Sequence, residues 1–528
     1  MKENRDFFEP IMFESSQEFS SLSKGKASYK LEKVYFPKDG NKRFGFTTGV
    51  RVHFVGIGGI GMCGLAELLH HSGIFVTGSD LVENAQIQRL RELGISVSIG
   101  HKKENIENTE IIIQSSAVPE NNIEIQTAQN RKLPIIKRSE ALAEIMRLKR
   151  GLVVAGTHGK TTTTHLLAQI FIHNKKDPTV VIGGRSHLFQ STAFPGKGKW
   201  FIAESDESDG GFKSLSPEMA VITNIDRDHL DYYGSFEKLK SAFLDFVLKV
   251  PFYGCVVAWG DQPVLRDLLS NIEQKVIFYG FNPDNHFVLE KDKAQKYRVF
   301  INEQEMGLLN VPLPGSMNAL NTLAACATAM TIGFSFEECS QSFLQFKGVD
   351  RRFHKKAELN PKGLVVTNSG KAVPPGEVEK QPKGLNQVNT ESIEFYDDYA
   401  HHPTEVRAVL SAFREKFGKE KRLIVLFQPH RFSRTSDCWS HFLTCFKEAD
   451  HVFLTDIYPA GETPMKGISS DVLAKEIQHP SCSYCSEADI FSVLLPILKG
   501  GDVFITMGAG SIYKYGDSLI SQFRERCG

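Results

Sequence analysis

The stretch from Gly151 to Lys175 constrains the fold more than any other part of this chain. The apolar residues Leu152–Ala155 predict a short buried strand, and Gly-Thr-His-Gly-Lys-Thr at 156–161 predicts a tight turn. Apolar residues at 166, 167, 170 and 171 then recur at helical spacing. A strand, a glycine turn and a helix that begins with Lys-Thr form a cradle for phosphate groups, because backbone N–H groups and the positive end of the helix face the ligand.

Two side chains of this turn have the chemistry that a nucleotide site needs. Lys160 is expected to reach the terminal phosphates, and the Thr161 hydroxyl is expected to bind a magnesium ion. Val154 stands where the usual phosphate loop has its first glycine, so this is a shorter version. The alternative is an ordinary strand-to-helix turn, but four consecutive threonines are poor helix formers and need another reason to be there.

Length and composition set the class of protein. With 528 residues the chain is expected to form roughly three domains. The 62 Lys and Arg residues balance 62 Asp and Glu residues, which leaves no net basic field for a nucleic acid. The N-terminus has no signal-peptide pattern, and the longest apolar run, Phe54–Ala66, is too short to span a membrane. A cytoplasmic protein without a membrane or nucleic acid partner is predicted.

The nine scattered cysteines do not form a disulfide framework. Cys482 and Cys485 make the only Cys-x-x-Cys pair. A metal or redox role is one interpretation of this pair. Because no second pair accompanies it, incidental thiols are favoured.

Residues 1–49 lack sustained periodicity and are interpreted as an N-terminal extension, partly packed on the domain that follows. From residue 50 to 149 the pattern is Rossmann-like. A strand at Val52–Val55 leads into Gly-x-Gly-x-x-Gly, a strand at Ile74–Thr77 leads to Asp80, and a third at Ile111–Gln114 leads to Ser115 and Ser116. The turn suits NAD or any other diphosphate, and a structural domain without a ligand is the alternative.

Carboxylates follow a predicted strand at Trp200–Ala203 in the central domain, residues 150–347. Glu204 comes first and is the best candidate for a magnesium ligand beside the phosphates, with a solvated acidic loop as the alternative. His229 lies between Asp228 and Asp231 after another strand and is a candidate ligand of a second metal ion. A hydrogen-bonded loop histidine is the bland interpretation of His229.

Two further groups of residues have open interpretations. Asn318 and Asn321 precede or enter an alanine-rich helix, where an amide would contact adenine or cap the helix. Arg351 and Arg352 stand at a domain junction, where they would clamp phosphates or form salt bridges.

The third domain, residues 348–528, alternates strands and helices and is expected to be a parallel α/β domain. Residues 360–390 are rich in proline, glycine and asparagine and predict a flexible insertion that interrupts a hairpin. Polar residues collect where strands end, for example in the segment 397–405 after the strand at Ser392–Tyr396. A ligand is expected at that edge.

Seven motifs, in order, resemble those of the Mur ligases, which extend the peptidoglycan precursor. They are AGTHGKTTTT, AESDESDGGF, TNIDRDHLD, GVDRRF, DDYAHHPTEV, FQPHRFSRT and DIYPAGE. The glycine turn GIGGIGM also looks like this family's, where it holds a UDP diphosphate. The likeness covers residues 50–528 apart from the insertion. It is greatest to the members that join L-alanine to UDP-N-acetylmuramate with ATP, through an acyl phosphate.

The resemblance implies roles for individual residues. The expected catalytic residues are Lys160, Glu204, His229 and Arg351. The expected ATP site is Gly156, Thr157, His158, Gly159, Lys160, Thr161, Thr162, Asn318, Asn321, Arg352 and Asp398, and the expected magnesium ligands are Thr161, Glu204 and His229. The expected UDP-sugar site is Gly56, Gly58, Gly59, Gly61, Asp80, Ser115 and Ser116. The expected amino-acid pocket is Tyr399, His401, His430, Arg431 and Arg434.

The chain departs from the family pattern in two places. Met317 stands where the family often has histidine, and Phe432-Ser433 replaces the usual Tyr-Thr. The rival functions are a ligase that attaches a recycled peptide to the same sugar, an NAD-dependent oxidoreductase and a non-catalytic nucleotide-binding regulator. The oligomeric state, the preference for alanine over glycine or serine, and the roles of the extension and the insertion stay open.

Overall fold

The computed structural model describes residues 49–183, 191–207, 210–292, 296–360, 365–366, 372–373 and 392–527. The predicted extension and most of the predicted insertion lie outside these residues. Within the insertion, β17 (Val365–Val366) and β18 (Ala372–Val373) pair with each other. The described residues contain no helix that is both long and apolar enough to cross a membrane.

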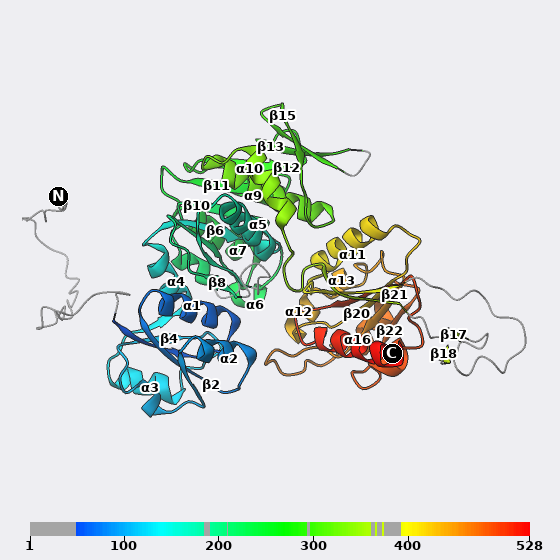
Figure 1. Cartoon of the computed structure of the whole chain (residues 1–528), viewed down its shortest axis with the longest axis horizontal. Helices are drawn as coiled ribbons and strands as arrows, with labels where there is room; N and C mark the ends of the chain where they lie inside the picture. Colours follow the sequence, from blue (N-terminus) through cyan, green and yellow to red (C-terminus); the bar gives the residue numbers. More distant parts are fainter. Residues whose placement is uncertain are drawn as a thin grey trace, which may run out of the picture. The chain divides into compact units, whose positions relative to one another are not determined.

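The first domain, coloured blue to cyan in Figure 1, contains a parallel five-stranded sheet. Its strand order is β3-β2-β1-β4-β5. Its elements are β1 (Arg51–Val55), α1 (Ile60–His71), β2 (Phe75–Asp80), α2 (Ala85–Glu92), β3 (Ser96–Ile99), β4 (Ile111–Gln114), α3 (Ile123–Asn130), β5 (Ile135–Lys137) and α4 (Arg138–Met146). The strand order reverses at β1, so the glycine turn after β1 lies at the switch point where such sheets bind ligands. The predicted Rossmann-like sheet is confirmed.

The central domain has a ten-stranded sheet in the order β15-β14-β13-β12-β11-β10-β6-β9-β7-β8. Its strands are β6 (Arg150–Ala155), β7 (Thr179–Val181), β8 (Ala193–Phe194), β9 (Trp200–Glu204), β10 (Met219–Ile222), β11 (Cys255–Trp259), β12 (Val276–Gly280), β13 (Phe287–Lys291), β14 (Tyr297–Ile301) and β15 (Gln304–Leu309). Its helices are α5 (Lys160–His173), α6 (Leu230–Tyr233), α7 (Phe236–Val247), α8 (Pro263–Leu269), α9 (Ser316–Thr331) and α10 (Phe336–Ser342). The sequence did not predict the antiparallel strands β14 and β15.

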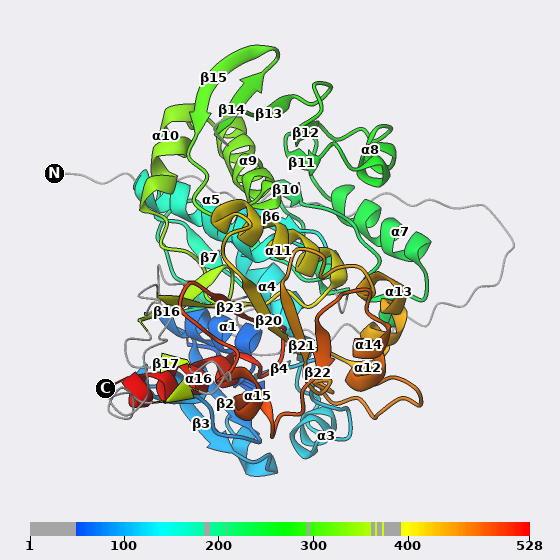
Figure 2. The ribbon, with the colours of Figure 1, turned by 90° about the vertical axis from the view of Figure 1, so that its right-hand side faces the viewer.

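Strand β6 is buried on both faces, which explains its unbroken apolar run. Leu152 and Val154 belong to the core that contains α5 and α9, whereas Val153 and Ala155 belong to the core on the other face. Helices α5 and α9 pack against each other (Figure 2). Every residue from Thr161 to Phe171 is buried. The threonine run, which has low helix propensity, therefore lies in this packed interface.

The neighbours of β6 bring the functional loops together. Parallel strands β9 and β10 flank β6, and Val154 is in register with both Glu204 and Val221. The segments that follow these three strands therefore meet at one edge of the sheet. Because pairing continues to Glu204, the expectation that this residue follows the strand was wrong: it is the last residue of β9.

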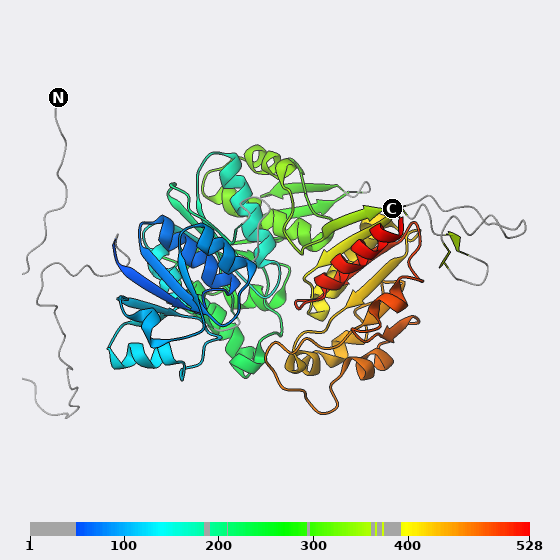
Figure 3. The same cartoon turned by 60° about the horizontal axis from the view of Figure 1, so that its bottom comes forward.

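The third domain has a six-stranded sheet in the order β16-β19-β23-β20-β21-β22, parallel except for β16. Its elements are β16 (His354–Leu359), β19 (Ile393–Asp398), α11 (Pro403–Phe417), β20 (Leu423–Phe427), α12 (Phe432–Asp437), α13 (Trp439–Phe442), β21 (His451–Leu454), α14 (Ser470–Glu476), β22 (Cys482–Tyr484), α15 (Ile490–Leu494), β23 (Val503–Met507) and α16 (Tyr513–Cys527). Helix α16 lies across one face of this sheet (Figure 3). The predicted hairpin is confirmed, because β16 pairs antiparallel with β19.

Candidate active site

The turn between β6 and α5 has the backbone of a phosphate-binding loop. Gly156 and Gly159 have φ angles of 130° and 82°, which residues other than glycine rarely adopt. A Cβ on Gly159 would lie 2.5 Å from Oδ1 of Asn321 in α9. The loop is also held by Asn224, which follows β10: its carbonyl accepts the Thr157 N–H, and its Oδ1 accepts the His158 N–H.

Lys160 points into a cluster of acidic groups beside this loop. Its Nζ donates to Glu207 Oε2 at 2.8 Å and to the Thr157 carbonyl at 3.1 Å. Burial disfavours the charged form, but Glu207 and Asp206 outweigh it and raise the pKa of Lys160. The lysine is therefore positively charged, which suits it to bind phosphate oxygens.

Thr161 and Glu204 lie together, as a shared magnesium ion requires. The Thr161 hydroxyl donates to Glu204 Oε1 at 2.8 Å, and the Gly183 N–H donates to Glu204 Oε2 at the same distance. A hydroxyl and a carboxylate beside a phosphate loop are the hard oxygen ligands that Mg²⁺ prefers. These two predicted ligands fit the ion.

The third predicted metal ligand, His229, lies beside two carboxylates other than that of Glu204. Ligand atoms of His229, Asp206 and Glu207 lie within 4.8 Å of one another. Burial lowers the pKa of His229, which favours the neutral imidazole that binds metals. The Glu207 side chain is 1% exposed, and its Oε1 has no hydrogen-bond partner among the described residues.

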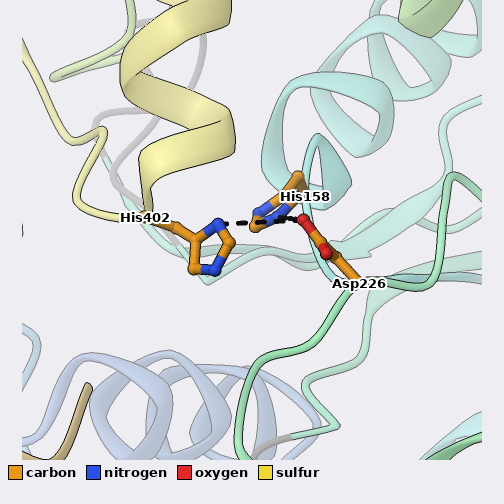
Figure 4. Close-up of side chains that lie close together, drawn as sticks. All are labelled: His158, Asp226 and His402. Carbon is orange, nitrogen blue, oxygen red and sulfur yellow. Dashed lines mark hydrogen bonds and ion pairs between the residues drawn. The ribbon is translucent and has the colours of Figure 1, made fainter. Parts of the chain in front are cut away.

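A second group of side chains joins the phosphate loop to the third domain. His158 Nε2 lies 3.0 Å from Asp226 Oδ2, and the Thr404 hydroxyl donates to the same oxygen at 2.8 Å. His402, at the start of α11, lies beside them (Figure 4). Burial alone would lower the pKa of His158, but Asp226 and Glu405 hold it near 9, so the ring is an imidazolium at neutral pH.

The residues predicted for the amino-acid pocket form one continuous group. The rings of Tyr399 and His401 lie 5.5 Å apart and those of His401 and His430 lie 5.9 Å apart, centroid to centroid. His430 Nδ1 lies 3.2 Å from Arg434 Nη1. Arg431 is the fifth member and lies 3.5 Å from Asp231 of the central domain.

Arg434 of the third domain forms a salt bridge with Asp228 of the central domain. Its Nε and Nη2 donate to the two oxygens of Asp228 at 3.1 and 3.3 Å, and both side chains are 8% exposed. Asp228, Asp231, Arg431 and Arg434 all line a cavity of about 230 Å³. Because Asp228 fills the fork of this guanidinium, Arg434 is fixed at the wall of the cavity.

Four other predicted nucleotide contacts have partners within the chain. Arg351 Nε donates to Asp397 at 2.9 Å, and its guanidinium lies 4.9 Å from the Tyr399 ring centre. Arg352 lies over the same ring at 5.0 Å. The Asp398 oxygens accept the Phe353 and Ala400 N–H groups, and Asn318 Nδ2 donates to the Pro314 carbonyl. Their contacts with ATP stay predictions, whereas Asn321 lies directly beside the loop.

In the first domain the predicted residues gather around the glycine turn. Gly59 is the residue before α1, and a Cβ on Gly56 would lie 2.9 Å from Ser115. Asp80 accepts the Gly58 N–H at 2.8 Å, so in this arrangement its carboxylate braces the loop. Ser116 is exposed at the same edge. Gly61 packs against Arg138, a cation that the sequence analysis did not consider for the diphosphate.

Sequence reasoning missed other residues of the central site as well. The sequence analysis assigns no role of their own to five residues that belong to its motifs: Glu207, Asp226, Asp228, His402 and Glu405. The signal was present, because each lies within four residues of a predicted site residue. The thiols of Cys482 and Cys485 are free, and burial raises their pKa values to about 11, which fits the interpretation of incidental thiols.

Comparisons with known proteins agree with this arrangement. Three family models match the chain: "Mur ligase family, catalytic domain" at residues 51–150, "Mur ligase middle domain" at 154–329 and "Mur ligase, glutamate ligase domain" at 385–510. A Bdellovibrio bacteriovorus protein named UDP-N-acetylmuramate–L-alanine ligase is 48% identical over 479 residues, which cover 89% of this chain and 98% of that protein. A protein of the same name from Lawsonia intracellularis is 42% identical over 477 residues, with coverage of 89% and 98%.

A solved structure extends the comparison to the fold. The crystal structure of a UDP-N-acetylmuramate–alanine ligase from Thermotoga maritima matches with a TM-score of 0.70 at 27% identity, covering 90% of this chain and 99% of that one. Sequence, family models and fold therefore agree over nearly the full length of these relatives. The chain belongs to the Mur ligase family.

Proposed function

We propose that this protein is an ATP-dependent ligase that joins L-alanine to the carboxylate of UDP-N-acetylmuramate. The observation that carries the proposal is a relative named for this reaction, to which the chain is 48% identical over 98% of the relative's length. The site supports it, because a phosphate loop with a charged lysine lies next to a cavity that Arg431 and Arg434 line with positive charge. We place the reaction in the cytoplasm.

The chemistry explains why such an enzyme needs ATP. A carboxylate does not react with an amine at neutral pH, because its oxygen is a very poor leaving group. Transfer of the γ-phosphoryl group to the sugar's carboxylate makes an acyl phosphate, from which phosphate leaves readily. The alanine amine then attacks the carbonyl carbon, and the products are the amide, ADP and phosphate.

The chain's own residues bring these reactants together. Lys160 offsets the repulsion between the two anions that must meet, since its charge is held at the loop by Glu207 and Asp206. The glycine turn after β1 would hold the UDP diphosphate. The amino acid would be oriented on the far side of the reacting carboxylate by Arg431, Arg434, His401 and His430.

Thr161 and Glu204 would hold a magnesium ion, with His229, Asp206 and Glu207 available to a second one. When bound, magnesium neutralises charge on the phosphate oxygens. The fit of these oxygen ligands supports the proposal.

Phosphate release tests the proposal and separates it from its rivals. Each of ATP, UDP-N-acetylmuramate and L-alanine is omitted in turn, and glycine, L-serine and a cell-wall peptide are offered in place of alanine. We expect release only with all three substrates and fastest with L-alanine. Release that prefers the peptide would favour the recycling ligase. Nicotinamide reduction without ADP formation would favour the oxidoreductase, and absence of any ADP would favour a regulator.

A further inference from the structure

Two imidazoles and one carboxylate face one another where the phosphate loop meets α11 (Figure 4). His158 Nε2 and His402 Nδ1 lie 3.0 and 3.7 Å from Asp226 Oδ2. Donor atoms of the three residues all lie within 4.8 Å of one another. This cluster shares no residue with the predicted magnesium ligands Thr161, Glu204 and His229.

The spacing suits a small tetrahedral ion. Zinc binds histidine nitrogen and carboxylate oxygen at about 2.0–2.2 Å, so two ligand atoms of one tetrahedral ion lie roughly 3.3 Å apart. The two measured separations from Asp226 bracket this value. Because His158 and His402 are 11% and 6% exposed, their rings are held in place by packing.

The remaining polar atoms have the partners that metal-binding histidines usually have. His158 Nδ1 lies 3.3 Å from Glu405 Oε1, which gives a carboxylate–histidine pair behind the cluster. His402 Nε2 lies 3.4 Å from Cys438 Sγ. Asp226 Oδ1, the oxygen that does not face the two histidines, accepts the Arg227 N–H at 2.7 Å. Each of the three proposed ligands is thus oriented by a neighbour that contacts its other polar atom.

We propose that His158, Asp226 and His402 form a transition-metal site, with Zn²⁺ as its natural ion, that fastens the phosphate loop to the third domain. Imidazole nitrogens select zinc over magnesium, which prefers oxygen ligands such as those of Thr161 and Glu204. Asp226 and His402 line the cavity of about 230 Å³, from which a solvent molecule can supply the fourth ligand.

Binding has two local consequences. The ion replaces the proton that His158 shares with Asp226, so one proton is released for each ion bound. His402 Nδ1 gives up the N–H of Thr404, a bond of 3.3 Å at the start of α11. In return the ion would link a residue of the phosphate loop to the first residue before α11.

Calorimetric titration of the full chain with Zn²⁺, in a metal-free buffer that contains millimolar Mg²⁺, tests the site. We expect one zinc ion for each chain beyond any that His229, Asp206 and Glu207 bind, and a visible absorption spectrum typical of tetrahedral coordination when Co²⁺ replaces zinc. No zinc binding above the magnesium background would overturn the proposal.

Variants locate the ion. His402→Gln should weaken zinc binding at least about 100-fold, because a ligand is lost, and Cys438→Ser or Glu405→Gln should weaken it about 10- to 100-fold through orientation alone. His441→Gln is the matched control: this histidine lines the same cavity outside the cluster and should leave zinc affinity unchanged.

The milder variants guard against a folding artefact, since Cys438→Ser keeps a small polar group at a buried position. A normal thermal unfolding curve with weakened zinc binding in Cys438→Ser supports the site. Equal zinc affinity in wild type, His402→Gln and Cys438→Ser would contradict it, as would a loss of affinity in His441→Gln.

Discussion

At the residue scale, three of the ten described residues other than glycine that have positive φ angles belong to the candidate site. His229, Arg351 and Arg431 have φ angles of 56°, 58° and 68°. Each such residue costs about 1–3 kcal/mol and keeps its conformation only where its surroundings enforce it. Arg431 Nε is also buried without a hydrogen-bond partner among the described residues, although it lies 4.0 Å from Glu462 Oε1. Strain at three predicted site residues indicates that the fold holds their side chains in fixed directions.

Replacement of Lys160 by alanine should abolish ligation. The variant removes the charge that the phosphates meet, so we expect kcat to fall at least about 100-fold. Lys197→Ala is the control, because this exposed lysine precedes β9 at the opposite end of the strand and should leave kcat unchanged. Product formation at more than a tenth of the wild-type rate in Lys160→Ala would remove this lysine from the mechanism.

His158 should make stability depend on pH. Its folded pKa of about 9 lies above the unfolded value of about 6.5, so its contribution is fully present below pH 6.5 and is lost as pH rises through 9. A shift of this size corresponds to roughly 3 kcal/mol at most. With a chelator present, the difference in Tm between wild type and His158→Gln should shrink between pH 6.5 and 9. A difference that is constant over this range would contradict the charged bridge.

At the element scale, the sequence predicted what local pattern controls. The strand at 111–114 has the predicted bounds because an apolar run marks it, and the helix predicted from the spacing of residues 166, 167, 170 and 171 is α5. The antiparallel strands β14 and β15 were missed, because their residues mix polar and apolar types without a long run. The contacts of Asp228 with Arg434 and of His158 with Glu405 depend on how two domains meet, which local pattern does not contain.

The loop before α5 gives a prediction at this scale. Gly159→Ala adds a Cβ at φ 82° that would lie 2.5 Å from Asn321, so it should lower stability by more than strain alone. Gly94→Ala is the matched control, with a φ of 89° and no atom within 4 Å of the new Cβ. We expect Gly94→Ala to cost about 1 kcal/mol and Gly159→Ala clearly more, with weaker ATP binding. Equal Tm losses would show that Asn321 moves aside freely.

At the scale of the whole molecule, charged pairs join the central and third domains around the candidate active site. The buried pair of Asp228 with Arg434 is the most enclosed, whereas Asp231 and Arg431 are 47% and 37% exposed. Breaking a buried pair costs about 3–5 kcal/mol, and breaking an exposed one costs 0–1 kcal/mol. The joining of the domains should therefore depend on Asp228 and hardly on Asp231.

Hydrogen exchange in α12 measures this dependence, since α12 carries Arg434. Asp228→Asn should speed exchange of its backbone N–H groups at least about 10-fold, whereas Asp231→Asn should change it less than about 3-fold. If the two variants speed exchange equally, the buried pair does not hold the helix in place.

The most direct test of the account follows oxygen from one substrate to one product. UDP-N-acetylmuramate labelled with oxygen-18 in its carboxylate is converted with ATP and L-alanine, and the released phosphate is examined by mass spectrometry. Transfer of the γ-phosphoryl group to the carboxylate predicts that each phosphate released carries one labelled oxygen, while the amide keeps the other. Unlabelled phosphate from a complete turnover would contradict the acyl phosphate and the roles assigned to the residues around Lys160.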